Sequence, residues 1–151
     1  MLQDRIPIEN SMNDKKLIKI LSETRKWAES QCHPTSKFDA DLAGFCAIGA
    51  HRLHTILSEV GYKVSIGLAD DGNYSCHCFV ILDSDDLILD VTATQFYQFR
   101  DTRVNIIPVK EAEQYWFYNP RKIFRDTKRF RKFLIRDNWT AHQIPLSDAG
   151  G

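Results

Sequence analysis

Three side chains in the middle of the chain, those of Cys46, His77 and Asp90, together have the functional groups for nucleophilic catalysis by a thiol. A thiol attacks a carbonyl carbon efficiently only as a thiolate, and a neighbouring imidazole can remove its proton. A carboxylate can hold that imidazole in the required tautomer and orientation. These three residue types therefore predict acyl transfer from a carbonyl group through a thioester.

Cys46 lies near the beginning of a predicted helix, which ends at Gly61. If the helix begins at Gly44, the thiol lies in its first turn, where free amide hydrogens and the helix dipole favour a thiolate. If Asp41 caps the helix instead, Cys46 lies a full turn inside it and is a core residue. The start of the helix therefore decides between a reactive and a structural cysteine.

His77 and Asp90 lie on two of three consecutive strands that the sequence predicts. Short apolar runs separated by turns rich in aspartate are typical of an antiparallel meander. The predicted strands are residues 62–69, 74–82 and 87–93. His77 lies in the second strand and Asp90 in the third, so we expect neighbouring strands to carry them.

The length of the loop between these two strands decides whether the imidazole and the carboxylate share a face of the sheet. A loop of two or four residues places His77 and Asp90 on the same face, either opposite or diagonal to each other. A three-residue loop would place them on opposite faces. We expect the four-residue loop 83–86, because Leu82 and Leu87 flank four polar residues.

Each of the three residues also has a structural explanation. Free cysteine is among the most buried residue types, and a histidine in a strand is commonly a satisfied core or surface group. Asp90 is harder to explain in this way, because it lies between Leu89 and Val91 and a buried carboxylate without a partner is costly. We therefore favour the triad over three unrelated structural residues.

Size and composition predict an ordinary globular protein. The chain has 151 residues, of which 43% are hydrophobic and 26% are charged, and its formal net charge is zero. We predict one domain over 1–151, with an arm at 1–10, a core at 11–140 and a flexible tail at 145–151. The neutral charge does not favour nucleic acid as a partner, and no stretch has the length of a membrane span.

The beginning of the chain lacks the basic and then apolar regions of a secretory signal. A cytoplasmic location is therefore expected, and export as an effector without a cleaved signal stays open. The cysteines at 32, 46, 76 and 78 are too few and too irregular for a disulfide framework. Alternation along a strand places Cys76 and Cys78 on one face and His77 on the other, so we expect no zinc site and no cofactor.

The remaining elements are predicted from periodicity and turn residues. The segment Ser11–Asp14 reads as a capping box, and a helix follows it to about Ser30. Residues 104–109 are expected to form an edge strand, because Pro108 cannot donate a ladder hydrogen bond. Further helices are predicted at 110–118 and 121–136.

The segment 121–136 is strongly basic. Such a segment could contact an acidic protein partner, an anionic membrane or nucleic acid. The alternative is a solvated face of an amphipathic helix, with Ile123, Phe130 and Leu134 packed inward. We favour the solvated face, because the chain as a whole is neutral, and contact with an acidic partner stays open.

The segments around the three residues resemble the papain-like and transglutaminase-like superfamily of cysteine enzymes. The resemblance runs from about residue 41 to residue 96, a third of the chain. It rests on three motifs: Leu42-x-Gly-x-Cys46, Cys-His77-Cys-Phe-Val80 and Leu89-Asp-Val-Thr-Ala-Thr-Gln-Phe96. The last is similar to the D-[IVL]-T-x-x-Q-F segment of small bacterial transglutaminase-like proteins, and the order and gap lengths resemble those of bacterial effector deamidases and cysteine proteases.

The resemblance implies an α+β fold in which a central helix carrying Cys46 packs on an antiparallel sheet carrying His77 and Asp90. It implies that Cys46 is the nucleophile, His77 the general base and acid, and Asp90 the group that orients the imidazole. The expected reaction is hydrolysis of an amide or peptide carbonyl in a protein or peptide substrate, by a cysteine peptidase, amidase or glutamine deamidase. The alternatives are a transglutaminase or acyltransferase with the same triad, or a non-catalytic interaction module on the same scaffold.

One departure from the family pattern concerns the oxyanion hole. Papain-type enzymes have a glutamine a few residues before the cysteine, whereas residues 38–41 here are Phe-Asp-Ala-Asp. The backbone amide of Cys46 could supply one oxyanion donor, and the second donor is not identified. Gln95 is a candidate for an oxyanion or site-supporting role, or it only anchors the end of its strand.

Overall fold

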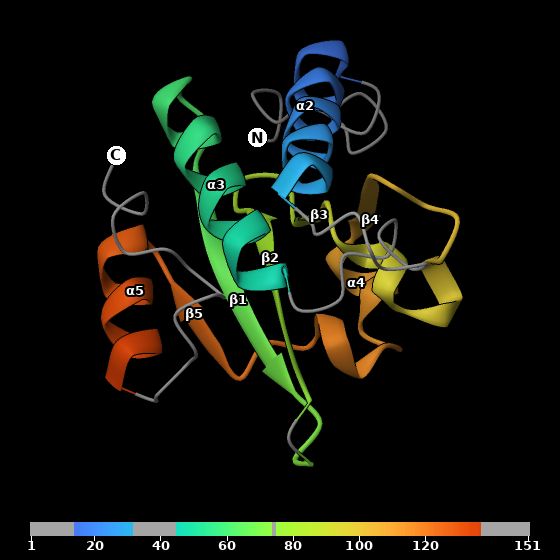
Figure 1. Ribbon diagram of the computed structural model, residues 1–151, viewed down its shortest axis with the longest axis vertical. Helices are drawn as coiled ribbons and strands as arrows, with labels where there is room; N and C mark the ends of the chain where they lie inside the picture. The colour runs from blue at the N-terminus through green and yellow to red at the C-terminus, as the bar shows by residue number, and fades with distance from the viewer. Residues whose placement is uncertain (1–13, 32–44, 74, 137–151) are drawn as a thin grey trace, which may run out of the picture.

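The computed structural model describes residues 14–31, 45–73 and 75–136, and within these ranges it has an antiparallel five-stranded sheet with helices packed against it (Figure 1). The order of the strands is β4-β3-β2-β1-β5. The strands are β1 (Val64–Asp70), β2 (Cys76–Leu82), β3 (Leu87–Asp90), β4 (Asn105–Pro108) and β5 (Lys122–Phe124). The helices are α2 (Lys15–Gln31), α3 (Cys46–Glu59), α4 (Val109–Ala112) and α5 (Thr127–Arg136). The predicted α+β class is confirmed.

The ends of the first two helices follow from local chemistry. The carboxylate of Asp14 accepts hydrogen bonds from the amides of Lys16 and Leu17, at 2.9 and 3.2 Å, so Asp14 itself caps α2. The sequence-based prediction started the cap at Ser11, which lies outside the described residues. The helix α3 ends shortly before Gly61, which adopts a φ of 101°, a left-handed conformation that glycine reaches at little cost.

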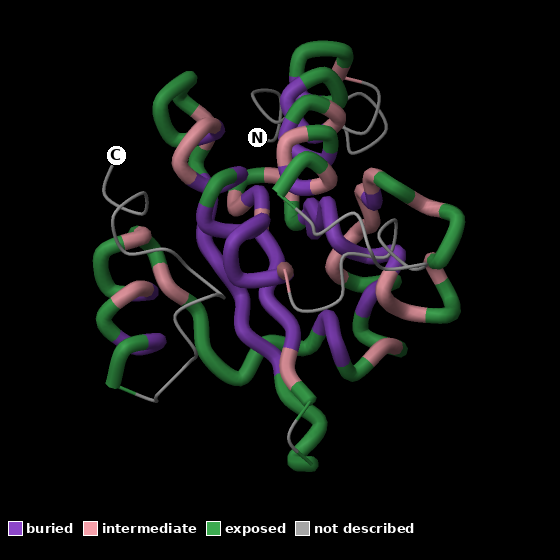
Figure 2. The backbone as a smooth tube through the Cα atoms, viewed as in Figure 1, coloured by how far each residue is buried: buried purple, intermediate pink, exposed green. Residues whose placement is uncertain are grey.

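Two apolar clusters pack against opposite faces of the sheet. The main cluster lies between one face and the helices α2, α3 and α5, and contains Leu21, Leu53, Val80 and Phe130. The smaller cluster packs on the other face against the segment that follows β4, and contains Phe79, Phe117 and Tyr118. Figure 2 shows the buried residues concentrated in the strands and on the inner sides of α2 and α3. Alternation along β2 therefore gives its two faces different surroundings.

Three predicted elements differ from the structure. The strand predicted at 87–93 ends at Asp90, because the side chain of Asp90 accepts a hydrogen bond from the amide of Thr92 and turns the chain. The helix predicted at 110–118 is only the single turn α4 followed by a 3-10 turn, Trp116–Tyr118. Asn119 stabilises this irregular path by donating to the carbonyls of residues 113 and 115.

The third difference lies at the end of the described chain. The segment predicted as one helix over 121–136 begins with β5, which pairs with β1 and so covers the edge of that strand. The helix α5 starts only after Asp126, whose carboxylate accepts a hydrogen bond from the amide of Arg129 at 2.8 Å. By contrast, the predicted edge strand at 104–109 is confirmed as β4.

The predicted arm at 1–10 and the tail at 145–151 lie outside the described residues. Within the described part of the chain, no helix has the length and apolar character needed to cross a membrane. The cytoplasmic location stays a prediction.

Candidate functional site

The hairpin between β2 and β3 has the four-residue loop 83–86, so the even spacing expected from the sequence is confirmed. Leu82 pairs with Leu87 and Val80 pairs with Leu89. Continuing this register by one pair places Asp90 opposite residue 79 and diagonal to His77, on the same face of the sheet.

The ladder between β2 and β3 stops at Val80 and Leu89, before it reaches His77. The first turn of α3 lies against the chain that continues from the end of β3. A Cβ atom added to Gly49 would lie 3.2 Å from Cγ2 of Thr92. The early end of β3 therefore brings the beginning of a helix close to the residue that follows Asp90.

The carboxylate of Asp90 is buried and fully engaged. Its Oδ2 lies 2.7 Å from Nε2 of His77 and accepts a hydrogen bond from the hydroxyl of Tyr118 at 2.8 Å. Its Oδ1 accepts hydrogen bonds from the amide and the hydroxyl of Thr92, at 2.9 and 3.1 Å. The phenol of Tyr118 in turn accepts a hydrogen bond from the amide of Asn105 at 3.0 Å. Four donors thus compensate the burial of one negative charge.

These contacts determine the protonation states of Asp90 and His77. Burial alone raises the pKa of Asp90, but the charge and hydrogen bond of His77, together with Thr92 and Tyr118, bring it below its ordinary value. Burial likewise lowers the pKa of His77, but Asp90 and then Cys46 outweigh burial and raise the pKa of His77 to about 9. At neutral pH the pair is therefore a carboxylate and an imidazolium.

Cys46 is the first residue of α3, so the start of the helix that favours a reactive thiol is the one observed. The thiol forms a side-chain hydrogen bond with His77. Because Nε2 of His77 is bound to Asp90, the nitrogen left for the sulfur is Nδ1. Cys46, His77 and Asp90 are thus brought together in one continuous array.

The pKa of the Cys46 thiol lies well below its ordinary value. A hydrogen bond from the thiol of Cys78 contributes most, burial opposes the shift, and the hydrogen bond and charge of His77 support it. The thiol and the imidazole therefore favour the thiolate–imidazolium pair, the form in which a cysteine is nucleophilic.

Gln95 lies beside the same imidazole. Its side-chain amide nitrogen is 3.3 Å from Nδ1 of His77 and donates to the carbonyl of Thr92 at 2.9 Å. The structure thus places Gln95 at the nitrogen that faces Cys46, on the 3-10 turn that directly follows β3. Its oxyanion or supporting role stays a prediction, and its position is suited to either role.

Aromatic rings surround His77 on the face of the sheet that carries it. The ring of Phe96 meets the imidazole edge-on at 4.7 Å between centroids, and Phe117 stacks on Phe96 at 3.8 Å. The ring centroids of Phe79 and Tyr118 lie farther from that of the imidazole, at 6.0 and 5.9 Å. This apolar wall holds the ring in place and excludes water from its ion pair, which strengthens the electrostatic interactions.

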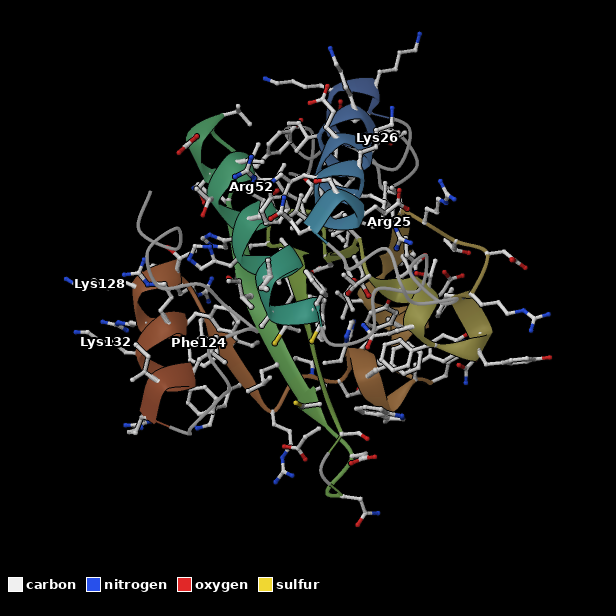
Figure 3. The ribbon with its side chains drawn as sticks, viewed as in Figure 1. Arg25, Lys26, Arg52, Phe124, Lys128 and Lys132 are labelled. Atoms are coloured by element: carbon white, nitrogen blue, oxygen red, sulfur yellow. The ribbon has the colours of Figure 1, made fainter. Side chains whose placement is uncertain are left out.

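Arg25 fixes the turn that follows Asp90. Its guanidinium extends from α2 and donates to the carbonyl of Val91 at 2.9 Å and to the hydroxyl of Thr94 at 2.8 Å (Figure 3). It is 2% exposed and pairs with Glu29 at 2.8 Å. A buried arginine thus ties α2 to the segment between Asp90 and Gln95.

Sequence reasoning missed the three positioning residues Tyr118, Asn105 and Arg25. A signal for Asn105 was present, because an edge strand beside β3 brings it opposite Asp90 in the observed register. Tyr118 had a weaker signal, which is the need of a buried carboxylate for more donors than one histidine supplies. Helical periodicity places Arg25 on the buried face of α2, but it places several core residues on the same face and so does not single out Arg25.

The three residues of the array have little contact with solvent in this conformation. Cys46 is 4% exposed, His77 is 0% exposed and Asp90 is 2% exposed. A molecule from solvent therefore reaches the sulfur only when neighbouring atoms move. Among the described residues, no group of three or more histidine, cysteine or acidic side chains has an arrangement suited to a metal ion.

Some basic side chains of the segment 121–136 project into solvent, and others form ion pairs. Phe130, Phe133 and Leu134 are buried, whereas Lys128 and Lys132 project away from the body on the outer side of α5 (Figure 3). Arginines of the same segment pair with acidic groups, including Arg121 with Asp70 at 2.9 Å and Arg125 with Asp83 at 3.5 Å. Ile123, predicted to pack inward, is 54% exposed because it belongs to β5 and not to the helix.

Comparisons with known proteins give no family for this chain. No protein-family model, no curated protein and no solved structure matches it significantly.

Proposed function

We propose that the chain is a thiol enzyme in which Cys46 is the nucleophile, His77 the general base and acid, and Asp90 the group that orients His77. The observation that carries this proposal is the continuous array of hydrogen bonds from the thiol to the carboxylate, with pKa shifts that favour the ion pair. Strongly shifted titrating groups with specific charged partners are concentrated at functional sites.

The proposed reaction is hydrolysis of an amide or peptide carbonyl. The thiolate of Cys46 attacks the carbonyl carbon, and the imidazolium of His77 donates its proton to the departing amine or ammonia. His77 then removes a proton from water, which attacks the thioester and releases the acid. The first amides of α3 support the oxyanion, because a helix begins with amides that have no partner within the helix.

This chemistry corresponds to a cysteine peptidase, an amidase or a glutamine deamidase. A papain-like or transglutaminase-like core is proposed for the fold, supported by the packing of α3 on β2 and by the positions of the three residues on α3, β2 and β3.

Transfer to an amine is a second candidate, and the burial of the site favours it. The imidazole is 0% exposed and lies among aromatic rings, so water has limited access to a thioester on Cys46. A primary amine held in this apolar surrounding would then compete with water for the thioester. The same triad would act as a transglutaminase or an acyltransferase.

A protein or peptide with an acidic segment is the substrate class that the surface supports. The projecting amines of Lys128 and Lys132 lie on the outer side of α5, where they are available to a negatively charged segment. This contact with an acidic partner is part of the proposal, whereas the array at Cys46 does not depend on it.

The test of the proposed chemistry uses an activated ester, because the natural substrate is not known. p-Nitrophenyl acetate should give a burst of nitrophenolate stoichiometric with the protein, and mass spectrometry should locate the acetyl group on Cys46. His77→Ala should remove the burst in a variant whose circular dichroism matches that of the parent chain. Acetylation elsewhere, or an equal burst from His77→Ala, would contradict the proposal.

Products from a glutamine-rich protein then separate the candidate reactions. A casein digest with and without methylamine should yield shorter peptides, glutamate in place of glutamine, or methylamide adducts. These correspond to a peptidase, a deamidase and a transferase. Cys46→Ala is the matched control, and a product that it also forms does not belong to this site.

A further inference from the structure

The structure brings a second thiol to the reactive cysteine. Cys46, Cys76 and Cys78 are all free, and Cys76 and Cys78 alternate along β2 so that both face α3. Cys46 and Cys78 both belong to the main core cluster, at 4% and 1% exposed. The proposed acyl transfer uses one thiol as the nucleophile, and the second serves it only as a hydrogen-bond donor.

The contact between Cys46 and Cys78 is direct. The thiol of Cys78 donates a hydrogen bond to the sulfur of Cys46. The two residues lie on α3 and β2, which pack against each other, and both belong to the main core cluster. Cys76, two residues earlier on the strand, interacts with Cys46 only through charge.

We propose that Cys46 and Cys78 form an oxidation site for hydroperoxides, in which Cys46 is oxidised first and Cys78 closes a reversible disulfide with it. The inference concerns the same thiol as the proposed function, but it requires only that Cys46 is a thiolate and not that the chain performs acyl transfer.

The first step is a two-electron oxidation of sulfur by hydrogen peroxide. The thiolate of Cys46 attacks one peroxide oxygen, the O–O bond breaks, and the electron pair leaves with the other oxygen. The imidazolium of His77 supplies the proton that turns this oxygen into water. Cys46 becomes a sulfenic acid, and His77 is left neutral.

The second step joins the two sulfurs. The sulfur of Cys78 attacks the sulfenic sulfur of Cys46, the S–O bond breaks, and hydroxide leaves with the thiol proton of Cys78 as water. No further oxidant is needed. Dithiothreitol or another dithiol reverses the sequence by returning two electrons to the disulfide.

Oxidation of Cys46 itself prepares Cys78 for this attack. In the reduced protein, burial raises the pKa of Cys78 well above its ordinary value, and the hydrogen bond to the Cys46 thiolate and its charge raise the pKa further. A sulfenic acid is uncharged, so these two contributions disappear when Cys46 is oxidised. Oxidation of Cys46 therefore removes part of what raises the pKa of Cys78, although burial continues to raise it.

Peptide mapping after peroxide treatment tests the proposal on the full chain. The protein is exposed to hydrogen peroxide, blocked with N-ethylmaleimide and digested without reduction. A Cys46–Cys78 linkage is expected in the parent chain and in Cys76→Ala, the matched control on the same face of β2. Reactivity of Cys46 with iodoacetamide should be lost and then return with dithiothreitol.

Oxidation of the Cys78→Ala variant should stop at the first step, the sulfenic acid. Its Cys46 should be labelled by dimedone, which marks a sulfenic acid, and should pass to the irreversible sulfinic acid with more peroxide. A parent chain that also passes to the sulfinic acid without the linkage overturns the proposal. A linkage from Cys46 to Cys76 or Cys32 overturns it as well.

These outcomes are separate from those of the acylation test. A disulfide between Cys46 and Cys78 without acylation of Cys46 by the activated ester would support the oxidation site and contradict the proposed enzyme. Acylation of Cys46 without the disulfide would support the proposed enzyme and contradict the oxidation site.

Discussion

At the scale of single residues, the site depends on how a buried charge is compensated. Asp90 accepts four hydrogen bonds, so its charge is stable in the core and available to the imidazole of His77. The imidazolium then stabilises the thiolate of Cys46. A thiol–imidazole pair without this carboxylate would favour its neutral form, because burial disfavours charge.

The lowered pKa of Cys46 predicts its selective alkylation. A short pulse of iodoacetamide near pH 7 should label Cys46 before Cys76 and Cys78, although Cys76 is the more exposed residue. The pKa of Cys76 is raised to about 11, chiefly by burial, so its thiolate is scarce at this pH. Quantitative mass spectrometry of the labelled peptides measures the order. Equal or slower labelling of Cys46 would mean that it is a core cysteine.

Asp90→Asn should narrow the pH range in which the ion pair exists. Asp90 raises the pKa of His77 to about 9, so the imidazolium of the variant should lose its proton at a lower pH. The thiolate–imidazolium pair would then break up below pH 9 instead of near it. Where turnover is measured, we expect a loss on the order of 10–1000-fold, smaller than the loss of about 10⁴ for the corresponding serine-enzyme change.

NMR titration of the His77 ring across pH 5–10 checks this prediction, and Asp83→Asn, a change outside the array, is the control. An unchanged titration midpoint would show that Asp90 does not act on the imidazole.

At the scale of elements, the site lies where β3 ends early. The loop 83–86 and the edge position of β4 were predictable, because short polar turns and proline constrain the chain locally. The sequence left the beginning of α3 open between Gly44 and a cap at Asp41, and the structure begins this helix at Cys46. The relation of His77 to Asp90 follows from the loop length alone. The sequence therefore predicted most of the array that joins α3, β2 and β3.

The supporting residues were not predictable for a physical reason. Tyr118 lies 28 residues from Asp90 and Arg25 lies 66 residues from Val91, and only tertiary packing brings these pairs together. The aromatic run that contains Tyr118 has a helical composition, yet its rings instead fill the apolar cluster on the second face of the sheet. Tertiary contacts outweigh local propensity in such segments.

Gly49→Ala should disturb the site more than it disturbs the fold. A Cβ atom there would lie 3.2 Å from Cγ2 of Thr92 and 3.3 Å from Cγ2 of Val91, so these side chains or α3 must give way by a few tenths of an ångström beside the turn that holds Asp90. Overpacking costs about 1–3 kcal/mol, and the better helix propensity of alanine offsets about 1 kcal/mol of this cost. Alkylation of Cys46 near pH 7 should therefore slow markedly while the melting temperature changes little.

Gly61→Ala is the matched control. Its φ of 101° strains a side chain, but nothing lies within 4 Å of the added Cβ. It should lower the melting temperature without slowing alkylation. Equal alkylation rates in all three proteins would show that the position of α3 does not set the reactivity of Cys46.

At the scale of the whole molecule, the packing of α3 on β1 and α5 makes stability sensitive to acid. Burial, Arg131 and His54 lower the pKa of His51 to about 4, and its Nε2 is buried without a hydrogen-bond partner. His54 is also buried, and its Nε2 bridges the carbonyls of Val64 and Arg125, at 3.1 and 3.2 Å. These two hydrogen bonds raise the pKa of His54, but burial outweighs them and lowers it below its ordinary value.

His51→Leu should protect the fold against mild acid. Between pH 6.5 and pH 4 the imidazole of His51 is protonated in the unfolded chain but neutral in the folded chain. The free energy of unfolding that neutral His51 contributes above pH 6.5 is therefore lost as the pH falls. Leucine removes this proton uptake and also the unpaired nitrogen. The melting temperature of the variant should therefore fall less than that of the parent between pH 7 and pH 5. Parallel curves would contradict the lowered pKa.

The distances along the chain between the contacts of Asp90 also set the order in which reactivity appears during synthesis. Cys46 and His77 are made well before Tyr118, whose hydroxyl donates to the carboxylate of Asp90. A growing polypeptide that ends before Tyr118 has no β5 or α5, so neither the core around Cys46 nor the support of Asp90 is complete. We therefore expect the newly made thiol to have an ordinary pKa, which falls only after the later segments have folded onto the sheet.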